Sequence, residues 1–333
     1  MHLGIIGYGY WGPNLLRNFA ECADVAVRAC ADLRPERRAL VQQRYPAVAV
    51  TANADDILTD PSIDAVVIAT PVSTHHALAK TALAHGKHVL VEKPITRTAA
   101  EAEELIALAQ RNGCVLMVDH TFVYTGAVRK MKEIVDAGEL GELHYLDGVR
   151  VNLGLFQHDI DVLWDLAPHD LSILTHLVTE QPQAVSAVGA DHTGSGFADV
   201  AYMTLHYPNN FIAHLHVNWL SPVKIRQMLI GGSRRMLVYN DMEPSEKVRV
   251  YDRGIRITTR ESVYQTLVDY RTGDMWAPKV EFREALAVEC EHFVACVRGT
   301  TAPWTGGDAG LQVVRLLEAA SRSLAAGGAR VAL

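Results

Sequence analysis

An acidic and a basic side chain stand four residues apart in an apolar stretch near the middle of the chain. Asp165 and His169 belong to residues 164–170, which read WDLAPHD. Burying both groups costs free energy unless they are paired or hydrogen-bonded, so the spacing indicates a functional pair or, alternatively, a helix cap with a hydrogen-bonded histidine. Histidine titrates near neutral pH and can take the proton of a hydroxyl group, and a neighbouring carboxylate can orient its ring. His169 is therefore a candidate general base that Asp165 orients.

Polar or turn-forming residues close two other apolar runs. Glu92, Lys93 and Pro94 follow one run directly, and Thr70 and Pro71 follow another. If both runs are strands of a parallel sheet, these residues lie at its carboxyl edge, where doubly wound folds bind their ligands. The ammonium group of Lys93 can there hold a hydroxyl of a cofactor ribose and a hydroxyl of a substrate. The alternatives are a solvated lysine and a plain turn at the ends of two strands.

A glycine-rich turn lies near the start of the chain. Residues 7–12 read GYGYWG and match the pattern G-x-G-x-x-G, between an apolar run and a helical segment. The first glycine permits a tight turn, the second lets the backbone approach a pyrophosphate, and the third lets helix and strand pack closely. The motif predicts a dinucleotide site whose members are Gly7, Gly9, Tyr10, Trp11 and Gly12.

Asp32 stands twenty residues beyond Gly12, at the end of the second apolar run. A carboxylate at this place meets the hydroxyls of the adenosine ribose and repels the 2′-phosphate of NADP, so the pattern favours NAD. Arg34 and Arg37 follow closely and can receive that phosphate, which keeps NADP as an alternative. Asp32 can also cap a helix that begins at Pro35.

Residues 1–120 alternate between short apolar runs and segments with helical spacing. The apolar runs are residues 3–6, 25–31, 65–69 and 88–91. The helical segments are residues 13–20, 35–44, 74–85 and 98–112. This alternation predicts an α/β domain of Rossmann type, with a doubly wound parallel sheet that carries the glycine turn and Lys93 at one edge.

From residue 121 to residue 333 the pattern changes to that of an α+β domain. Residues 200–207 and 211–219 form two alternating runs joined by a Pro-Asn-Asn turn, which predicts an antiparallel hairpin. Further strands are expected at residues 225–230, 235–239 and 247–252, and helices at 282–298 and 309–326. These elements predict a large, mostly antiparallel open sheet, and residues 211, 213, 215, 217 and 219 share its less polar face.

Composition limits the possible partners. The formal charge of -7 and the lack of a basic tract argue against nucleic acid as a partner, and no apolar run reaches the length that crosses a membrane. The five cysteines are scattered and contain no C-x-x-C pair, which is typical of reduced thiols and argues against a zinc site of thiolates. We therefore expect a cytoplasmic protein with a small-molecule partner and no metal.

Two other functions use part of this pattern. A ligand-rich stretch of His158, Asp159, Asp161, Asp165 and His169 admits a metal hydrolase, although its spacing matches no known metal motif. A non-catalytic nicotinamide-binding sensor needs the first domain but does not need Lys93, Asp165 and His169 to converge. Measured hydride transfer and metal analysis separate these alternatives from a dehydrogenase.

Taken together, the glycine fingerprint, the E-K-P tripeptide, the D-x-x-x-H pair and the hairpin-rich second half resemble the glucose-fructose oxidoreductase, inositol dehydrogenase and MocA family over essentially the whole chain. The resemblance implies hydride transfer between a nicotinamide and a ring hydroxyl or ketone of a sugar, nucleotide-sugar or cyclitol. It implies that Lys93, Asp165 and His169 meet at the nicotinamide, and that the peptide before Pro94 is cis. It also implies a homodimer or homotetramer formed through the open face of the second sheet.

The sequence departs from many family members just before the histidine, where Ala167-Pro168 replaces a glycine. With Arg150 and Asn152 and the pair His169-Asp170, this departure resembles a bacterial branch that acts on nucleotide-linked or amino sugars. Arg150, Asn152 and Asp170 are then candidate substrate contacts, and the alternative for Arg150 is a surface residue of a strand. Reduction of a keto-sugar, the reverse reaction, uses the same residues.

Overall fold

The computed structural model describes residues 1–154, 160–252, 254–256, 269–271 and 273–333. The chain divides into two compact units. The first contains Met1–Thr125 and Arg283–Glu318, and the second contains Gly126–Phe282 and Ala319–Leu333. A division of the chain at residue 120 differs from these units in two segments, 121–125 and Arg283–Glu318, which both belong to the first unit. Among the described residues no helix is long and apolar enough to cross a membrane.

The first unit contains a six-stranded sheet in which every neighbouring pair is parallel. In chain order the strands are β1 (His2–Ile6), β2 (Ala26–Ala31), β3 (Ala49–Thr51), β4 (Ala65–Ile68), β5 (His88–Glu92) and β6 (Leu116–Asp119). Their order in the sheet is β3-β2-β1-β4-β5-β6, the arrangement of dinucleotide-binding folds, which bind their ligand where the order reverses between β1 and β4. The α/β prediction is confirmed, and β3 and β6 are strands that the sequence pattern did not reveal.

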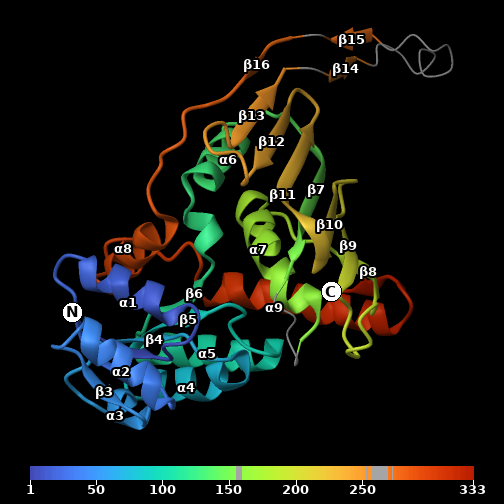
Figure 1. The fold of residues 1–333 in the computed structure, drawn as a ribbon. Helices are drawn as coiled ribbons and strands as arrows, with labels where there is room; N and C mark the ends of the chain where they lie inside the picture. Colours follow the sequence, from blue (N-terminus) through green and yellow to red (C-terminus); the bar gives the residue numbers. More distant parts are fainter. Residues whose placement is uncertain (155–159, 253, 257–268, 272) are drawn as a thin grey trace. The chain divides into compact units, whose positions relative to one another are not determined.

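Helices follow the strands of this unit (Figure 1). They are α1 (Gly12–Glu21), α2 (Pro35–Arg44), α3 (Asp55–Leu58), α4 (Val72–Ala84), α5 (Ala99–Asn112) and the 3₁₀ turn η1 (Thr121–Tyr124). Local sequence sets their ends. In α5, for example, Thr98 and Glu101 form a capping box at the start, and Gly113 ends the helix with a φ of 63°.

A late segment of the chain completes the core of the first unit. Helix α8 (Ala285–Val297) packs against α1, where the rings of Phe19 and Phe293 meet edge to face with centroids 6.0 Å apart. The N–H of Val118 in β6 donates to the carbonyl oxygen of Thr305, at 2.8 Å. These contacts join residues that lie far apart in the sequence, so local periodicity contains no sign of them.

The second unit contains a nine-stranded sheet. Its strands, in sheet order, are β16 (Met275–Trp276), β13 (Val248–Tyr251), β12 (Met236–Asn240), β11 (Leu220–Gly232), β7 (Leu143–Leu153), β10 (Ile212–Asn218), β9 (Val200–His206), β8 (Ala184–Ala190) and β17 (Val331–Ala332). Only β7 and β10 run parallel in this sheet; the other neighbours are antiparallel. A separate pair joins β14 (Gly254–Arg256) to β15 (Asp269–Arg271). The predicted α+β class is confirmed.

Helices cover one face of this sheet, and the side chains on its other face are more exposed. Helix α7 (Val162–Leu177) packs against β7, β9 and β10 (Figure 1), and α6 (Gly126–Asp136) packs against α7. The residues of β10 and its flanks that share the covered face are all buried: Phe211, Ala213, Leu215, Val217 and Trp219. Ile212, His214, His216 and Asn218 alternate with them and keep some exposure. The expected difference between the two faces is confirmed. The remaining helix, α9 (Gly307–Ala325), spans the division between the units.

Candidate active site

The glycine turn after β1 has a backbone that larger residues cannot reproduce. Gly7 has a φ of 97°, and a Cβ atom there would lie 2.4 Å from the carbonyl oxygen of Ala69. A Cβ atom on Gly12 would lie 2.2 Å from the carbonyl oxygen of Gly7, so the first residue of α1 packs directly against the backbone of the turn. A Cβ atom on Gly9 would have only Nη2 of Arg34 near it, at 3.5 Å. The space beside this backbone is therefore open enough for a phosphate to approach. The turn therefore fits a dinucleotide.

Asp32 lies at the end of β2 beside this turn, only 8% exposed. Its carboxylate accepts the N–H of Tyr8 at 2.8 Å, and the N–H and guanidinium of Arg34 at 2.9 and 3.1 Å. Burial alone raises the pKa of Asp32, but these hydrogen bonds outweigh it and hold the pKa below its ordinary value. Asp32 is thus a fixed anion, and Arg34 is occupied by it. The N-cap residue of α2 is Arg34, and no side chain caps the helix there, so the capping alternative for Asp32 is wrong.

Trp11 connects the turn to β6. Its indole N–H donates to Oδ2 of Asp119 at 2.7 Å, and its ring stacks on Tyr10, which is 85% exposed. Asp119 pairs in register with Glu92 across β5 and β6, at the carboxyl edge of the sheet. Asp119 was not among the predicted site residues. The signal that could have identified it is an acidic residue at the end of the short apolar run 116–118.

A buried acidic cluster of Glu92, Asp119 and Glu289 lies behind this edge. Burial and then the Asp119 carboxylate raise the pKa of both Glu92 and Glu289 well above the ordinary value. Glu289, on α8, is fully buried, and neither of its carboxyl oxygens has a donor partner among the described residues. A carboxylate in such surroundings is unstable, so burial and the neighbouring Asp119 favour the protonated, neutral form of Glu289.

His75, on α4, links the two loops that contain the other predicted cofactor residues. Its Nε2 bonds the carbonyl oxygen of Thr70 at 2.8 Å, and its Nδ1 bonds that of Pro94 at 2.9 Å. Burial lowers the pKa of His75, and the two carbonyl oxygens oppose that shift because they accept from the protonated ring. The Lys93-Pro94 peptide is cis, as the resemblance implies, and Pro71 is exposed at the start of α4. No pattern in the sequence distinguishes His75 from the histidines beside it.

In the second unit, Asp165 and His169 lie one helical turn apart on α7. The cap of α7 is Asp161, whose carboxylate accepts the N–H of Trp164 at 3.0 Å, so the alternative that Asp165 is a cap is wrong. Asp165 instead accepts the indole N–H of Trp219 at 3.0 Å. Both members of the predicted pair therefore lie on one helix, which also contains Pro168, and the indole N–H of Trp219 holds Asp165.

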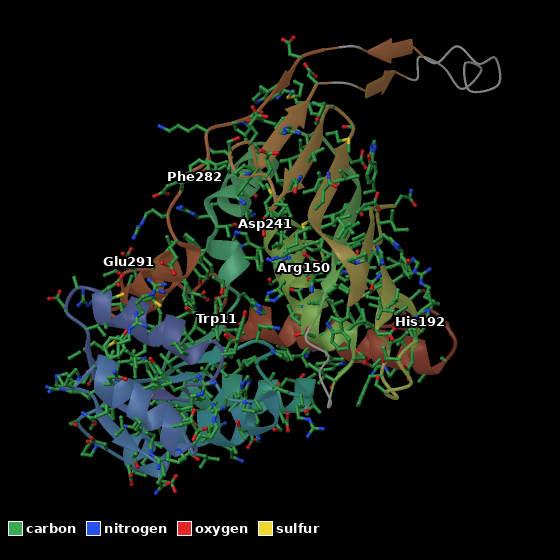
Figure 2. The ribbon with its side chains drawn as sticks, viewed as in Figure 1. Trp11, Arg150, His192, Asp241, Phe282 and Glu291 are labelled. Atoms are coloured by element: carbon green, nitrogen blue, oxygen red, sulfur yellow. The ribbon has the colours of Figure 1, made fainter. Side chains whose placement is uncertain are left out.

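Arg150 and Asp170 bind each other. Arg150 points from β7 toward α7, where its Nε and Nη2 donate to the two oxygens of Asp170 at 3.0 and 2.7 Å (Figure 2). Both side chains are almost fully buried, so the alternative that Arg150 is a surface residue is wrong. Asn152 lies two residues further along the same face of β7 and is half-buried. The structure thus joins two of the three predicted substrate contacts into one ion pair.

The ligand-rich stretch from His158 to His169 continues into α7. Its first two members, His158 and Asp159, lie outside the described residues. Within the part of the chain that the structure describes, no three histidine, cysteine, aspartate or glutamate side chains are grouped to hold a metal ion. Asp161 and Asp165 have backbone and indole donors as partners.

Comparisons with known proteins agree with this geometry. Residues 1–120 match the model of an oxidoreductase family with an NAD-binding Rossmann fold, and residues 128–238 match the GFO/IDH/MocA C-terminal domain. The UDP-N-acetylglucosamine 3-dehydrogenase of Acidithiobacillus ferrooxidans is 31% identical over 94% of each chain. This chain belongs to the Gfo/Idh/MocA oxidoreductase family.

Other relatives extend the comparison. A solved structure of the A. ferrooxidans enzyme superimposes on 98% of each chain with a TM-score of 0.84 and 27% identity. The scyllo-inositol 2-dehydrogenase (NAD(+)) of Bacillus subtilis is 25% identical over 90% of this chain and 86% of its own. The predicted family, fold and oxidoreductase class are confirmed, and the first domain is an NAD-binding Rossmann domain.

The neutral state of Glu289 predicts an unusual dependence of stability on pH. Above an ordinary carboxyl pKa of about 4.3 the unfolded chain releases a proton that the folded protein keeps, so the free energy of unfolding falls as pH rises, by up to about 1.4 kcal/mol per pH unit. Glu289→Gln removes this loss. We expect its melting temperature to exceed that of the wild type by a margin that grows between about pH 5 and pH 8.

The matched control is Glu291→Gln, an exposed carboxylate on the same helix that pairs with Arg283. Its melting curve should follow that of the wild type at every pH. A Glu289→Gln difference that stays constant with pH, or shrinks, contradicts a neutral Glu289.

Proposed function

We propose that the protein is an NAD-dependent dehydrogenase of a nucleotide-linked amino sugar, with Lys93, Asp165 and His169 as its catalytic residues. The substrate class is supported by the similarity to UDP-N-acetylglucosamine 3-dehydrogenase over 94% of both chains. One observation carries the acid and base roles: Asp165 and His169 are one turn apart on α7, and Asp165 has a fixed hydrogen-bond donor. Both residue types are those that hydroxyl deprotonation requires.

Each catalytic residue has one role in this proposal. NAD, when bound, would supply the acceptor for a hydride from a ring carbon. His169 takes the proton of the hydroxyl on that carbon, Asp165 orients the imidazole ring, and Lys93 holds the same hydroxyl through its ammonium group. The roles reverse when a keto-sugar is reduced, so the same residues serve either direction.

The cofactor contacts belong to the first unit. We propose that the turn formed by Gly7, Gly9 and Gly12 receives the pyrophosphate at the start of α1, because Gly7 and Gly12 permit its tight backbone and the space beside Gly9 is open. We assign the other predicted contacts to the edge of the sheet, at Tyr10, Trp11, Thr70, Pro71, Glu92, Lys93 and Pro94. Asp32 binds the ribose hydroxyls, and its ionised state together with the occupied Arg34 favours NAD over NADP.

On the substrate side we propose different roles for the predicted contacts. Arg150 and Asp170 compensate each other's charge, which supports a role in fixing α7 to β7 beside His169. Asn152 belongs to the same face of β7 and retains exposure, so its amide is the group we assign to substrate binding. The Rossmann domain is taken to extend over residues 1–120, with residues 121–333 providing the substrate and oligomerisation functions.

We also propose that the protein is cytoplasmic and forms a homodimer or homotetramer. Its five cysteines are all free thiols, which supports a reducing compartment. The less buried face of the nine-stranded sheet displays several exposed apolar side chains: Val188, Tyr202, Ile212 and Ile225. An apolar patch of this kind is typical of an interface between copies of a chain.

The catalytic assignment is tested with a panel of UDP-sugars, amino sugars, free aldoses and inositols, with NAD or NADP, by the absorbance of the reduced nicotinamide. For the substrate that responds, His169→Ala should lower kcat by about 10²- to 10⁴-fold and leave NAD affinity unchanged, because a general base contributes only to the chemical step. His176→Ala, in the last turn of the same helix, is the control. Turnover within a few-fold of wild type refutes the role of His169, and NAD binding without turnover across the panel favours the sensor.

The cofactor preference is tested at Asp32. Asp32→Asn removes the charge that repels a 2′-phosphate, so the ratio of kcat/KM for NAD to that for NADP should fall by about tenfold or more. Glu36→Gln, a carboxylate in the first turn of α2, should leave the ratio unchanged. An unchanged ratio in Asp32→Asn shows that another group selects the cofactor.

The oligomer is tested on the sheet face. Light scattering should give the wild type a mass of two or four times 36.5 kDa. Ile212→Glu places a charge in the patch and should dissociate the oligomer, while Leu40→Glu, at an exposed apolar position of α2, should not. A monomeric wild type contradicts the proposal.

A further inference from the structure

Trp219 is a fully buried tryptophan that joins two strands next to the proposed catalytic helix. It stands between β10 and β11, is 1% exposed, and donates its indole N–H to Oδ2 of Asp165 at 3.0 Å. The buried indole N–H of Trp219 needs an acceptor, and the half-buried carboxylate of Asp165 provides one. Each group therefore satisfies the other, and the pair fixes where one oxygen of Asp165 lies.

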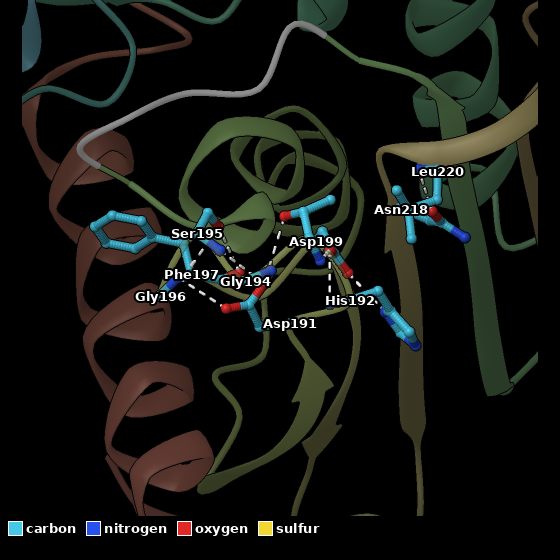
Figure 3. Close-up of polar contacts among 10 residues, drawn as sticks. Asp191, His192, Gly194, Ser195, Gly196, Phe197, Asp199, Asn218 and Leu220 are labelled. Atoms are coloured by element: carbon cyan, nitrogen blue, oxygen red, sulfur yellow. Dashed lines mark hydrogen bonds and ion pairs between the residues drawn. The ribbon is translucent and has the colours of Figure 1, made fainter.

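The backbone of Trp219 is held from two sides. Its N–H donates to the carbonyl oxygen of Asp199 at 2.9 Å, and its carbonyl oxygen accepts the N–H of Gly154 at 3.0 Å. A Cβ atom on Gly154 would lie 2.3 Å from Cδ1 of the indole, so this glycine makes room for the ring. At the strand junction Oδ1 of Asn218 accepts the N–H of Leu220 at 2.6 Å (Figure 3). The indole is thus held rigidly in its place.

The loop 191–199 provides the anchor on one side. The carboxylate of Asp199 is fully buried and accepts the backbone N–H groups of His192 and Thr193 and the ring Nδ1 of His192 (Figure 3). Burial raises the pKa of Asp199, but the hydrogen bonds from His192 and Thr193 bring it below its ordinary value. Asp199 is therefore ionised, and it orders the segment that holds the backbone of Trp219.

The same loop also contacts the start of the catalytic helix. The carbonyl oxygen of Ala198 accepts the N–H of Val162, the first residue of α7, at 3.0 Å. The tip of the loop is ordered by Asp191, whose carboxylate accepts the N–H groups of Gly194, Ser195 and Gly196 (Figure 3). One ordered loop therefore positions both α7 and the tryptophan that binds Asp165.

We propose that Trp219 is a positioning residue for the acid–base pair: its indole N–H holds one oxygen of Asp165 so that the carboxylate stays directed toward His169. The inference rests on the proposed roles of Asp165 and His169. A short acid on a helix has several rotamers, and only some of them face a residue one turn further on. The hydrogen bond removes the others, which keeps a negative charge beside the imidazole ring and stabilises its protonated form.

Trp219→Phe tests the inference because it keeps an aromatic ring against Gly154 and removes only the N–H. We expect the pKa of His169, followed by NMR of labelled histidine, to fall by about one pH unit, since the carboxylate no longer remains beside the ring. With the substrate found by the panel, kcat should fall by about tenfold with little change in KM, and the acidic limb of its pH profile should shift in the same direction.

Trp164→Phe is the matched control. Trp164 belongs to α7 itself, but its indole N–H donates to Ser321 at 2.9 Å, so its loss should leave the pKa of His169 unchanged. An unchanged His169 pKa in folded Trp219→Phe, or an equal shift in Trp164→Phe, overturns the inference. If Trp219→Phe does not fold, Asp165→Asn supplies the test: the indole resonance of Trp219 must move and that of Trp164 must not.

The result of the Trp219→Phe experiment can be distinguished from the result of the His169→Ala test of the proposed function. If His169→Ala retains turnover, the catalytic assignment fails, whereas the NMR titration still shows whether Trp219 controls the surroundings of His169. If His169→Ala is inactive and the titration is unchanged in Trp219→Phe, the catalytic assignment stands and the positioning role of Trp219 fails.

Discussion

A buried carboxylate is stable only where hydrogen-bond donors compensate its charge, and this requirement organises the polar residues of both units. Asp32 is held by the backbone at Tyr8 and by Arg34, and Asp119 by the indole of Trp11. In the second unit Asp165 has the indole of Trp219. The donor in each case holds the carboxyl group at a defined place. Glu289 lacks such a donor among the described residues, and burial beside Asp119 raises its pKa, which favours its neutral form.

The parts of the fold that depend on local periodicity were predictable. The strands at residues 65–68 and 88–92 are unbroken apolar runs, and the alternation in residues 212–218 identified the buried face of the second sheet. Strand β3 has only three residues, too few for a pattern. The position of α8 in the first unit depends on pairs such as Phe19 and Phe293, which no local pattern contains.

The residues of the candidate site also fall into two groups, those that local spacing predicts and those that only the folded structure reveals. Motif residues such as Gly7, Asp32 and His169 were predicted because their chemistry follows from spacing along the chain. Their hydrogen-bond partners were not predicted, because a donor such as Trp219, between β10 and β11, is 54 residues away from its acceptor. The pairing of Arg150 with Asp170 also joins a strand to a helix, and no local spacing predicts it.

The proposed reaction moves a hydride between a sugar ring carbon and NAD. It is tested by mass spectrometry of the reduced nicotinamide formed from a nucleotide-linked amino sugar that is deuterated on its ring carbons. We expect the reduced cofactor to contain deuterium and the sugar to lose it from one carbon. Reduced cofactor without deuterium, or a modified sugar with no reduced cofactor, would contradict it.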